Sequence, residues 1–215
     1  MKYISEIRSR LITWGVTNND DFPWRNPESL YESVVAEIML IRTPAEQVLP
    51  VYNKFINKFP KAGVLVKATI DDIEKEIKEL GLKWRAKRLK DMSLYFINNS
   101  ISDKINLSIE ELKQIPGVGD YASSAIFTFY YSKRSVPVDS NTVRFIKRFY
   151  GREFKGEARR NKELYNIINE IIPDEDDTAV KFNESFLDFM RKVCQPRDPN
   201  CITCSLRDIC SYPEF

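Results

Sequence analysis

Residues 112–122 read Leu112-Lys113-Gln114-Ile115-Pro116-Gly117-Val118-Gly119-Asp120-Tyr121-Ala122, and they place Pro-Gly-Val-Gly between two helical patterns. Two glycines around one apolar residue allow a tight turn with positive φ and leave the backbone bare enough for N–H groups to approach an anion. The dipole of the following helix adds to that attraction. A plain linker between two helices is the simpler interpretation of the same residues.

Apolar residues recur with helical spacing on both sides of this turn, and the chain has only seven glycines. This pattern predicts an all-α fold with short connections. The predicted helices cover residues 2–14, 29–41, 44–58, 61–66, 70–79, 83–98, 108–114, 120–131, 139–150, 157–171 and 178–193, with an irregular turn at 18–27.

Two helical lobes are expected. Residues 28–132 form the central lobe, which contains the hairpin at 108–131, and residues 1–27 with 133–215 form the second. A chain that leaves a lobe and returns to it leaves a cleft between the two.

The amino-acid composition restricts the possible catalytic groups more than the net charge restricts the possible partners. A formal net charge of +2 over 215 residues shows no overall cationic excess, so nucleic-acid binding would depend on local charge. The absence of histidine excludes Ser-His and Cys-His nucleophiles and leaves carboxylates, Tyr, Lys or Cys for acid–base work. We expect no signal peptide and no membrane span, and therefore a cytoplasmic protein.

All four cysteines lie near the end of the sequence, in one loop with the spacing C-x6-C-x2-C-x5-C: Cys194, Cys201, Cys204 and Cys210. Four thiolates in one loop suit an iron–sulfur cubane, which needs one ligand for each iron. Zinc sites more often show two C-x-x-C pairs, and only one is present here. The spacing therefore predicts an iron–sulfur cluster in loop 194–210, with structural zinc as the alternative.

Two carboxylates stand out. Glu37 interrupts a largely apolar helical run at 33–41, where a charge is costly unless it is paired, hydrated or protonated, so Glu37 is a candidate general acid. A structural glutamate bonded to a backbone terminus is the alternative. Asp139 stands at the predicted start of a helix, where an ionised carboxylate is favoured and where aspartate is also a common N-cap.

The segments from Phe22-Pro23-Trp24-Arg25 through Ile115–Asp139 to the final cysteines resemble the helix-hairpin-helix (HhH-GPD) DNA glycosylases of the endonuclease III and MutY type. The resemblance covers nearly the whole chain and implies a [4Fe-4S] cluster on the four cysteines. It also implies a catalytic role for Glu37, within Ala-Glu-Ile-Met-Leu-x-x-Thr. Asp139 would then stabilise an oxocarbenium-like sugar or position water.

Tyr121 occupies the position where bifunctional members of the family carry a lysine. Tyrosine cannot form a Schiff base with C1′, so the resemblance implies a monofunctional enzyme that leaves the backbone uncut. A role as an aromatic wall of the base pocket is compatible with this interpretation. The same residue argues against an abasic-site lyase.

Within the family, the chain resembles most closely the archaeal thymine glycosylases that act on G:T and G:U mismatches. The implied partner is double-stranded DNA with a mispaired base. Ile41-Arg42 replaces the glutamine pair of MutY, and we expect no further domain after Cys210 to read 8-oxoguanine. An adenine glycosylase acting on A:G or A:8-oxoG stays an alternative, as does a non-catalytic iron–sulfur module, which Glu37 and Asp139 disfavour.

The implied DNA contacts fall into two groups. Residues at turns would fill the stack that a flipped base vacates, although Trp84 suits a core position equally well: Ile41, Arg42, Lys83 and Trp84. Others would hold the backbone, with Arg197 presenting positive charge from the cysteine loop: Gly117, Val118, Gly119, Asn141, Arg144 and Arg197. We expect a monomer associated with the nucleoid.

Overall fold

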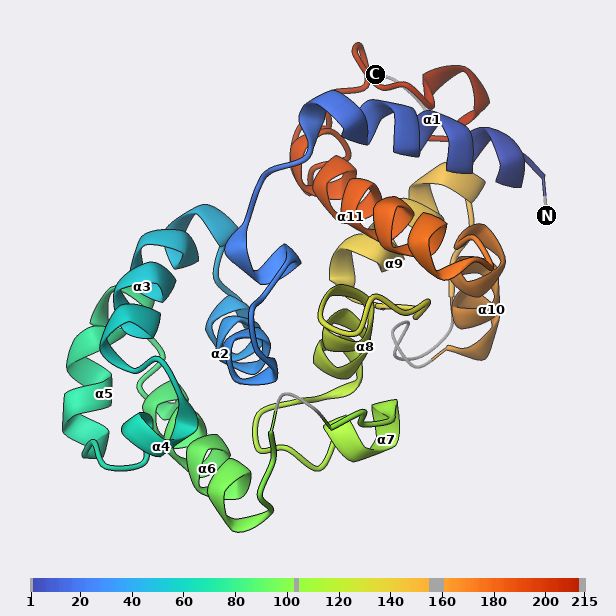
Figure 1. Ribbon diagram of the computed structural model, residues 1–215. Helices are drawn as coiled ribbons and strands as arrows, with labels where there is room; N and C mark the ends of the chain where they lie inside the picture. Colours follow the sequence, from blue (N-terminus) through green and yellow to red (C-terminus); the bar gives the residue numbers. More distant parts are fainter. Residues whose placement is uncertain (1, 103–104, 155–160, 213–215) are drawn as a thin grey trace. The chain divides into compact units, whose positions relative to one another are not determined.

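The computed structural model describes residues 2–102, 105–154 and 161–212 (Figure 1). These residues form helices joined by turns and contain no β-strand, which confirms the all-α prediction. The α-helices are α1 (Ile4–Asn18), α2 (Leu30–Leu40), α3 (Ala45–Lys58), α4 (Ala62–Leu65), α5 (Ile70–Glu76), α6 (Trp84–Asn98), α7 (Ile109–Leu112), α8 (Asp120–Phe129), α9 (Ser140–Tyr150), α10 (Lys162–Ile171) and α11 (Asp176–Lys192). The 3-10 helices are η1 (Pro23–Arg25), η2 (Lys78–Leu80) and η4 (Arg207–Ile209).

The chain divides into two compact units. Unit 1 comprises Met1–Asp21 and Ser132–Phe215, and unit 2 comprises Phe22–Tyr131. The sequence predicts that the chain passes from one lobe to the other between residues 27 and 28 and returns between residues 132 and 133. The chain enters unit 2 earlier than predicted, after Asp21. The reason is that Phe22 and Trp24 are each only 5% exposed and stack with ring centroids 4.8 Å apart in the core of unit 2.

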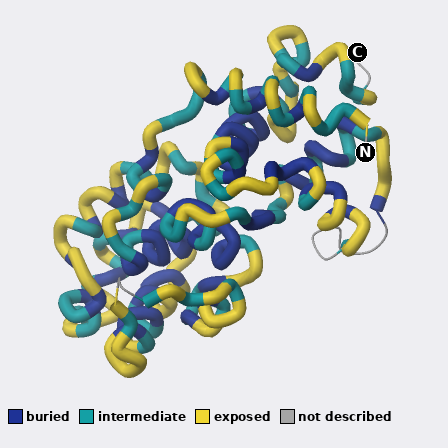
Figure 2. Tube along the Cα trace, turned by 45° about the vertical axis from the view of Figure 1, so that its right-hand side comes forward, coloured by how far each residue is buried: buried dark blue, intermediate teal, exposed yellow. Residues whose placement is uncertain are grey.

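Helix α2 runs through the core of unit 2. Its residues from Leu30 to Met39 are buried except Glu32, and Ser29 begins the helix by accepting the N–H of Glu32 at 3.1 Å. Tyr31 donates its hydroxyl hydrogen to the carbonyl of Phe59 at 2.8 Å, which ties α2 to the end of α3. Figure 2 colours the buried residues of the chain dark blue. An almost continuously apolar helix is stable here because neighbouring helices surround it.

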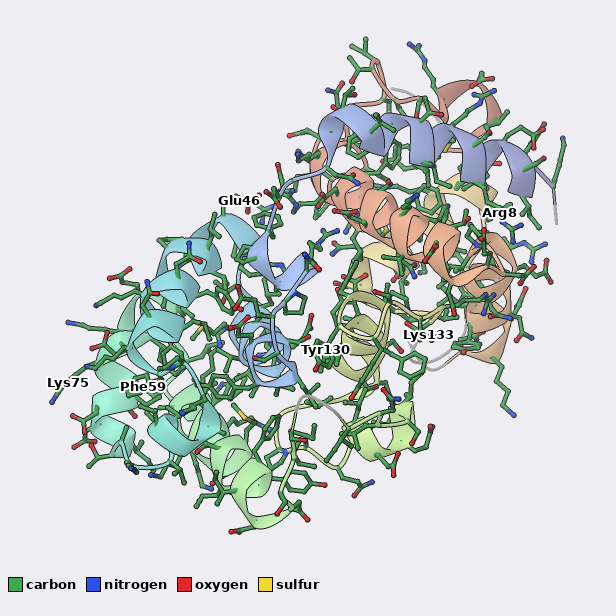
Figure 3. The ribbon with its side chains drawn as sticks, in the orientation of Figure 1. Arg8, Glu46, Phe59, Lys75, Tyr130 and Lys133 are labelled. Carbon is green, nitrogen blue, oxygen red and sulfur yellow. The ribbon has the colours of Figure 1, made fainter. Side chains whose placement is uncertain are left out.

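Helix α1 packs along α11 in unit 1, as Figure 1 shows. A Cβ atom built on Gly15 would lie 1.9 Å from Ser185 Oγ, so only glycine fits at this contact. Arg8, labelled in Figure 3, donates to the carbonyls of Glu170 and Ile171 at 2.8 Å each, and so satisfies the end of α10. Both contacts fix α1 in unit 1.

Several predicted helix boundaries differ from those observed, most of all at the end of the first helix and at the start of α10. The first helix continues to Asn18 rather than ending at residue 14, because Gly15 supports the helix-helix contact while its carbonyl accepts the N–H of Asn19 at 3.0 Å. The predicted helix at 157–171 appears as α10, which begins at Lys162 with Asn161 as its N-cap; residues 157–160 of that prediction lie outside the described residues.

Among the described helices, none has both the length and the apolar character needed to cross a membrane.

Candidate active site

Asp139 is the N-cap of α9 and a candidate catalytic residue of unit 1. Its Oδ1 accepts the backbone N–H groups of Asn141 and Thr142, each at 2.8 Å. Its own N–H donates to Thr142 Oγ1 at 2.7 Å, which completes a capping box. The N-cap interpretation is therefore confirmed. The side chain remains partly exposed.

A line of hydrogen bonds connects Asp139 with the cysteine loop. Asn141 Nδ2 donates to Asp139 Oδ2 at 2.6 Å, and Asn141 Oδ1 accepts from Arg144 Nη1 at 2.8 Å. Arg144 also donates through Nε to the carbonyl of Cys194 and through Nη2 to that of Met190, each at 3.0 Å. Asn141 and Arg144 thus have internal partners that were not expected from the sequence, and their contact with DNA stays a prediction.

Glu37 lies on α2 in unit 2 with 8% of its surface exposed. Burial raises the pKa of its carboxyl group to about 8, although the positive charge of Arg25 opposes the shift. The guanidinium of Arg25, at the end of η1, lies 5.0 Å from the ring centroid of Phe129 on α8. At neutral pH Glu37 therefore holds a proton. Arg25 was not predicted as a site residue, because its influence on Glu37 arises from the fold rather than from any sequence pattern.

The hairpin at 115–119 precedes α8 in unit 2. Gly117 has φ +98°, and a Cβ atom there would lie 2.9 Å from the side chain of Ile38, so the turn requires glycine. Gly119 instead has φ −105°, an ordinary value, which differs from the positive φ that the sequence allowed at both glycines. Gly119 is the N-cap of α8 and has no side chain to accept the first-turn N–H groups, which suits an external anion.

Two further residues of this segment have different environments. The side chain of Val118 is buried at 6% exposure, and its N–H donates to the carbonyl of Ile115 at 3.0 Å. Val118 therefore supports the turn from inside, and a contact of its backbone with DNA stays a prediction. Tyr121 is partly exposed in the first turn of α8.

The four cysteines line one pocket in unit 1: Cys194, Cys201, Cys204 and Cys210. Burial raises the pKa of the Cys204 thiol to about 11 and also raises that of Cys210. Arg148 donates to Cys194 Sγ at 3.7 Å and to the carbonyl of Gln195 at 2.6 Å. Four soft sulfur donors around one pocket fit an iron–sulfur cluster. Across the described residues, no Cys, His, Asp or Glu side chains are grouped closely enough to form a metal site as they stand.

Two loops of unit 2 carry the predicted stack-filling residues. Arg42, between α2 and α3, is exposed with φ +57°, and Lys83 is exposed just before α6. Trp84 is 39% exposed, so the core alternative for this residue is wrong. Leu82 beside it is 38% exposed with φ +52°, and it was not predicted because a single leucine near a glycine carries no distinctive pattern.

Comparisons with known proteins agree with this arrangement. Residues 35–173 match the profile of the HhH-GPD superfamily base excision DNA repair proteins. The chain is 34% identical to a thymine-DNA glycosylase of Aeropyrum pernix, over 97% of this chain and 95% of that protein. It is 32% identical to a thymine/uracil-DNA glycosylase of Methanothermobacter thermautotrophicus, over 96% and 92%.

A solved structure is also similar. The structure of a thermostable thymine-DNA glycosylase superimposes with a TM-score of 0.88 at 31% identity, covering 98% of this chain and 96% of the other. The family profile spans both the hairpin and Asp139, and the relatives match over nearly their whole length. This chain therefore belongs to the HhH-GPD superfamily of base excision DNA repair proteins.

Proposed function

We propose that the chain is a monofunctional DNA glycosylase that hydrolyses the N-glycosidic bond of thymine or uracil mispaired with guanine. The observation that carries the proposal is the buried Glu37, whose pKa of about 8 keeps a proton available at neutral pH. Relatives named as thymine-DNA and thymine/uracil-DNA glycosylases support the choice of base. The proposed partner is duplex DNA, bound by a monomer in the cytoplasm at the nucleoid.

The proposed chemistry divides between the carboxyl groups. Glu37 donates its proton to the departing base, which avoids release of a full negative charge. Asp139 places its carboxylate near the sugar, where negative charge stabilises an oxocarbenium-like transition state. Water then forms a bond to C1′, and the proton that it releases returns to the Glu37 carboxylate, which restores the acid. Tyr121 has no amine, so no Schiff base forms and the DNA backbone stays intact.

We also propose that the cysteine pocket holds a [4Fe-4S] cluster, with Cys194, Cys201, Cys204 and Cys210 as its ligands. The cluster would cross-link loop 194–210, which carries the exposed Arg197 as a candidate phosphate contact. Arg144 and Arg148 hold the start of this loop through backbone carbonyls. The residues of the chain thus position the loop, and the cluster would brace it.

Single-turnover excision tests the proposed function. End-labelled duplexes carry G:T, G:U, A:G or A:8-oxoG pairs, and strand breaks are scored before and after alkali. We expect release of thymine and uracil, with strand breaks only after alkali. Release of adenine alone would assign the chain to the adenine-specific branch, whereas breaks without alkali would contradict the role of Tyr121.

Borohydride trapping provides an independent control. Only an enzyme that forms a Schiff base is trapped on DNA by reduction, so the wild-type protein should yield no covalent complex. A bifunctional family member serves as the positive control. A trapped complex would show that an amine of the chain, from a lysine or the N-terminus, acts as the nucleophile.

A further inference from the structure

Arg85 is a completely buried cation in unit 2. It lies in the first turn of α6 with 0% of its surface exposed. Burial lowers the pKa of its guanidinium, and within the described residues no carboxylate forms an ion pair with it. Burial of a charge without a counter-ion costs free energy, so the hydrogen bonds of Arg85 must offset that cost.

The guanidinium joins two loops that are far apart in sequence. Nη1 donates to the carbonyls of Leu80 at 2.8 Å and Gly81 at 3.5 Å. Nη2 donates to the carbonyl of Ile41 and, at 2.6 Å, to Thr43 Oγ1. All of these acceptors are neutral. One planar group therefore holds loop 41–44 to the end of η2 and to loop 81–83, which follows it.

Both loops contain a residue in a conformation that is unfavourable for it. Arg42 has φ +57° and Leu82 has φ +52°, and neither is a glycine. Left-handed residues of this kind persist where surrounding contacts fix them. Leu82 also exposes its large apolar side chain, as does Trp84 two residues later. The guanidinium of Arg88 lies 5.4 Å from the Trp84 ring centroid.

We propose that Arg85 is a positioning residue that locks these two loops into one wedge, which enters the duplex when the mispaired base leaves the stack. The inference rests on the proposed function, together with the prediction from the sequence that residues at these turns fill the space left by the flipped base. A rigid pair of loops does not have to be ordered when DNA binds, so more of the contact energy remains for opening the stack.

Hydrogen–deuterium exchange of the DNA-free protein tests the lock without requiring activity. In Arg85→Met, backbone exchange in both loops should accelerate about tenfold, because charge-assisted hydrogen bonds are lost from each. Thr43→Val removes one acceptor and keeps the side-chain shape, so it should accelerate both loops less. Lys87→Met is the control, since Lys87 is exposed on the same helix and pairs with Asp91.

Unchanged exchange in both loops, or acceleration in only one, would overturn the lock. If Arg85→Met does not fold, Thr43→Val decides by the same criterion.

A second measurement tests the wedge. A duplex with 2-aminopurine beside a G:T pair reports base extrusion by its fluorescence. Arg85→Met should lower the equilibrium constant for base extrusion about tenfold, and Thr43→Val, used if Arg85→Met does not fold, should also lower it. In either variant, binding to fully paired DNA should change less than about twofold. If a variant shows faster hydrogen exchange in the loops but normal base extrusion, the proposed role of the two loops as a wedge is overturned. Failure of the wild type to release thymine or uracil would instead contradict the proposed function, and the exchange result would stand.

Discussion

The carboxyl group of Glu37 is buried in unit 2, whereas that of Asp139 is partly exposed and accepts two backbone N–H groups. Desolvation favours the protonated form of Glu37, whereas the Asp139 side chain accepts the N–H groups of Asn141 and Thr142 at the start of α9. The two groups therefore suit the two halves of an acid-assisted cleavage, proton donation and stabilisation of positive charge.

Glu37→Gln should change the pH dependence of stability. The unfolded carboxyl loses its proton near pH 4.5, whereas the folded one keeps it to about pH 8. Between these values the folded state binds more protons, so the contribution of Glu37 to stability is highest below pH 4.5 and falls by about 1.4 kcal/mol for each pH unit as the pH rises. Glutamine removes this dependence. Urea unfolding of both proteins at several pH values should show the difference, and parallel curves would contradict it.

Asp139→Asn should abolish excision while leaving mismatch binding. Asparagine keeps an oxygen that caps α9 but lacks the negative charge, so the rate should fall about 100-fold or more with little change in stability. Single-turnover rates, binding affinity and thermal unfolding measure the three effects. Full activity in the variant would remove Asp139 from the mechanism.

At the scale of the elements, periodic apolar patterns predicted nearly all the helices, because amphipathic spacing is a local property. The continuation of α1 past Gly15 was not predictable, since it depends on Ser185 in a distant helix. The roles of Arg25 and Arg85 were missed for the same reason: their partners become neighbours only in the fold. Candidate ligands and carboxylates were found because their residue types and spacing are distinctive.

Gly15→Ala should destabilise the contact between α1 and α11 by about 2 kcal/mol, despite the better helix propensity of alanine, because the new Cβ has no space. Ser185→Gly in the same chain should restore part of the loss. Gly63→Ala is the matched control: the nearest neighbour of its Cβ would be Ile97 Cδ1 at 4.0 Å, so it should stabilise by about 0.5–1 kcal/mol. Urea unfolding measures the free energy of unfolding of all three variants. Equal effects of Gly15→Ala and Gly63→Ala would contradict the expected clash at Ser185.

At the scale of the whole molecule, each unit has its own apolar core. The cysteine pocket is also lined by Phe145, Phe149 and Phe189, which belong to the core of unit 1. Loss of one of the proposed cluster ligands should therefore loosen unit 1 before unit 2.

Cys201→Ser should speed hydrogen exchange in α9 and α11 while exchange in α2 and α6 stays unchanged, because the second pair belongs to a separate core. Ile202→Ser is the control, since Ile202 is 83% exposed in the same loop and supplies no thiolate. Equal acceleration in both units, or none, would contradict this expectation.

The assembly of unit 1 from both ends of the chain has a consequence during translation. Helix α1 leaves the ribosome early, yet its packing partner α11 is made only after all of unit 2. At synthesis rates of about 5–20 residues per second, α1 waits on the order of ten seconds or more for that partner. Unit 2 has its whole contiguous segment available sooner, so we expect it to fold first, with α1 exposed to chaperones until Gly15 meets Ser185.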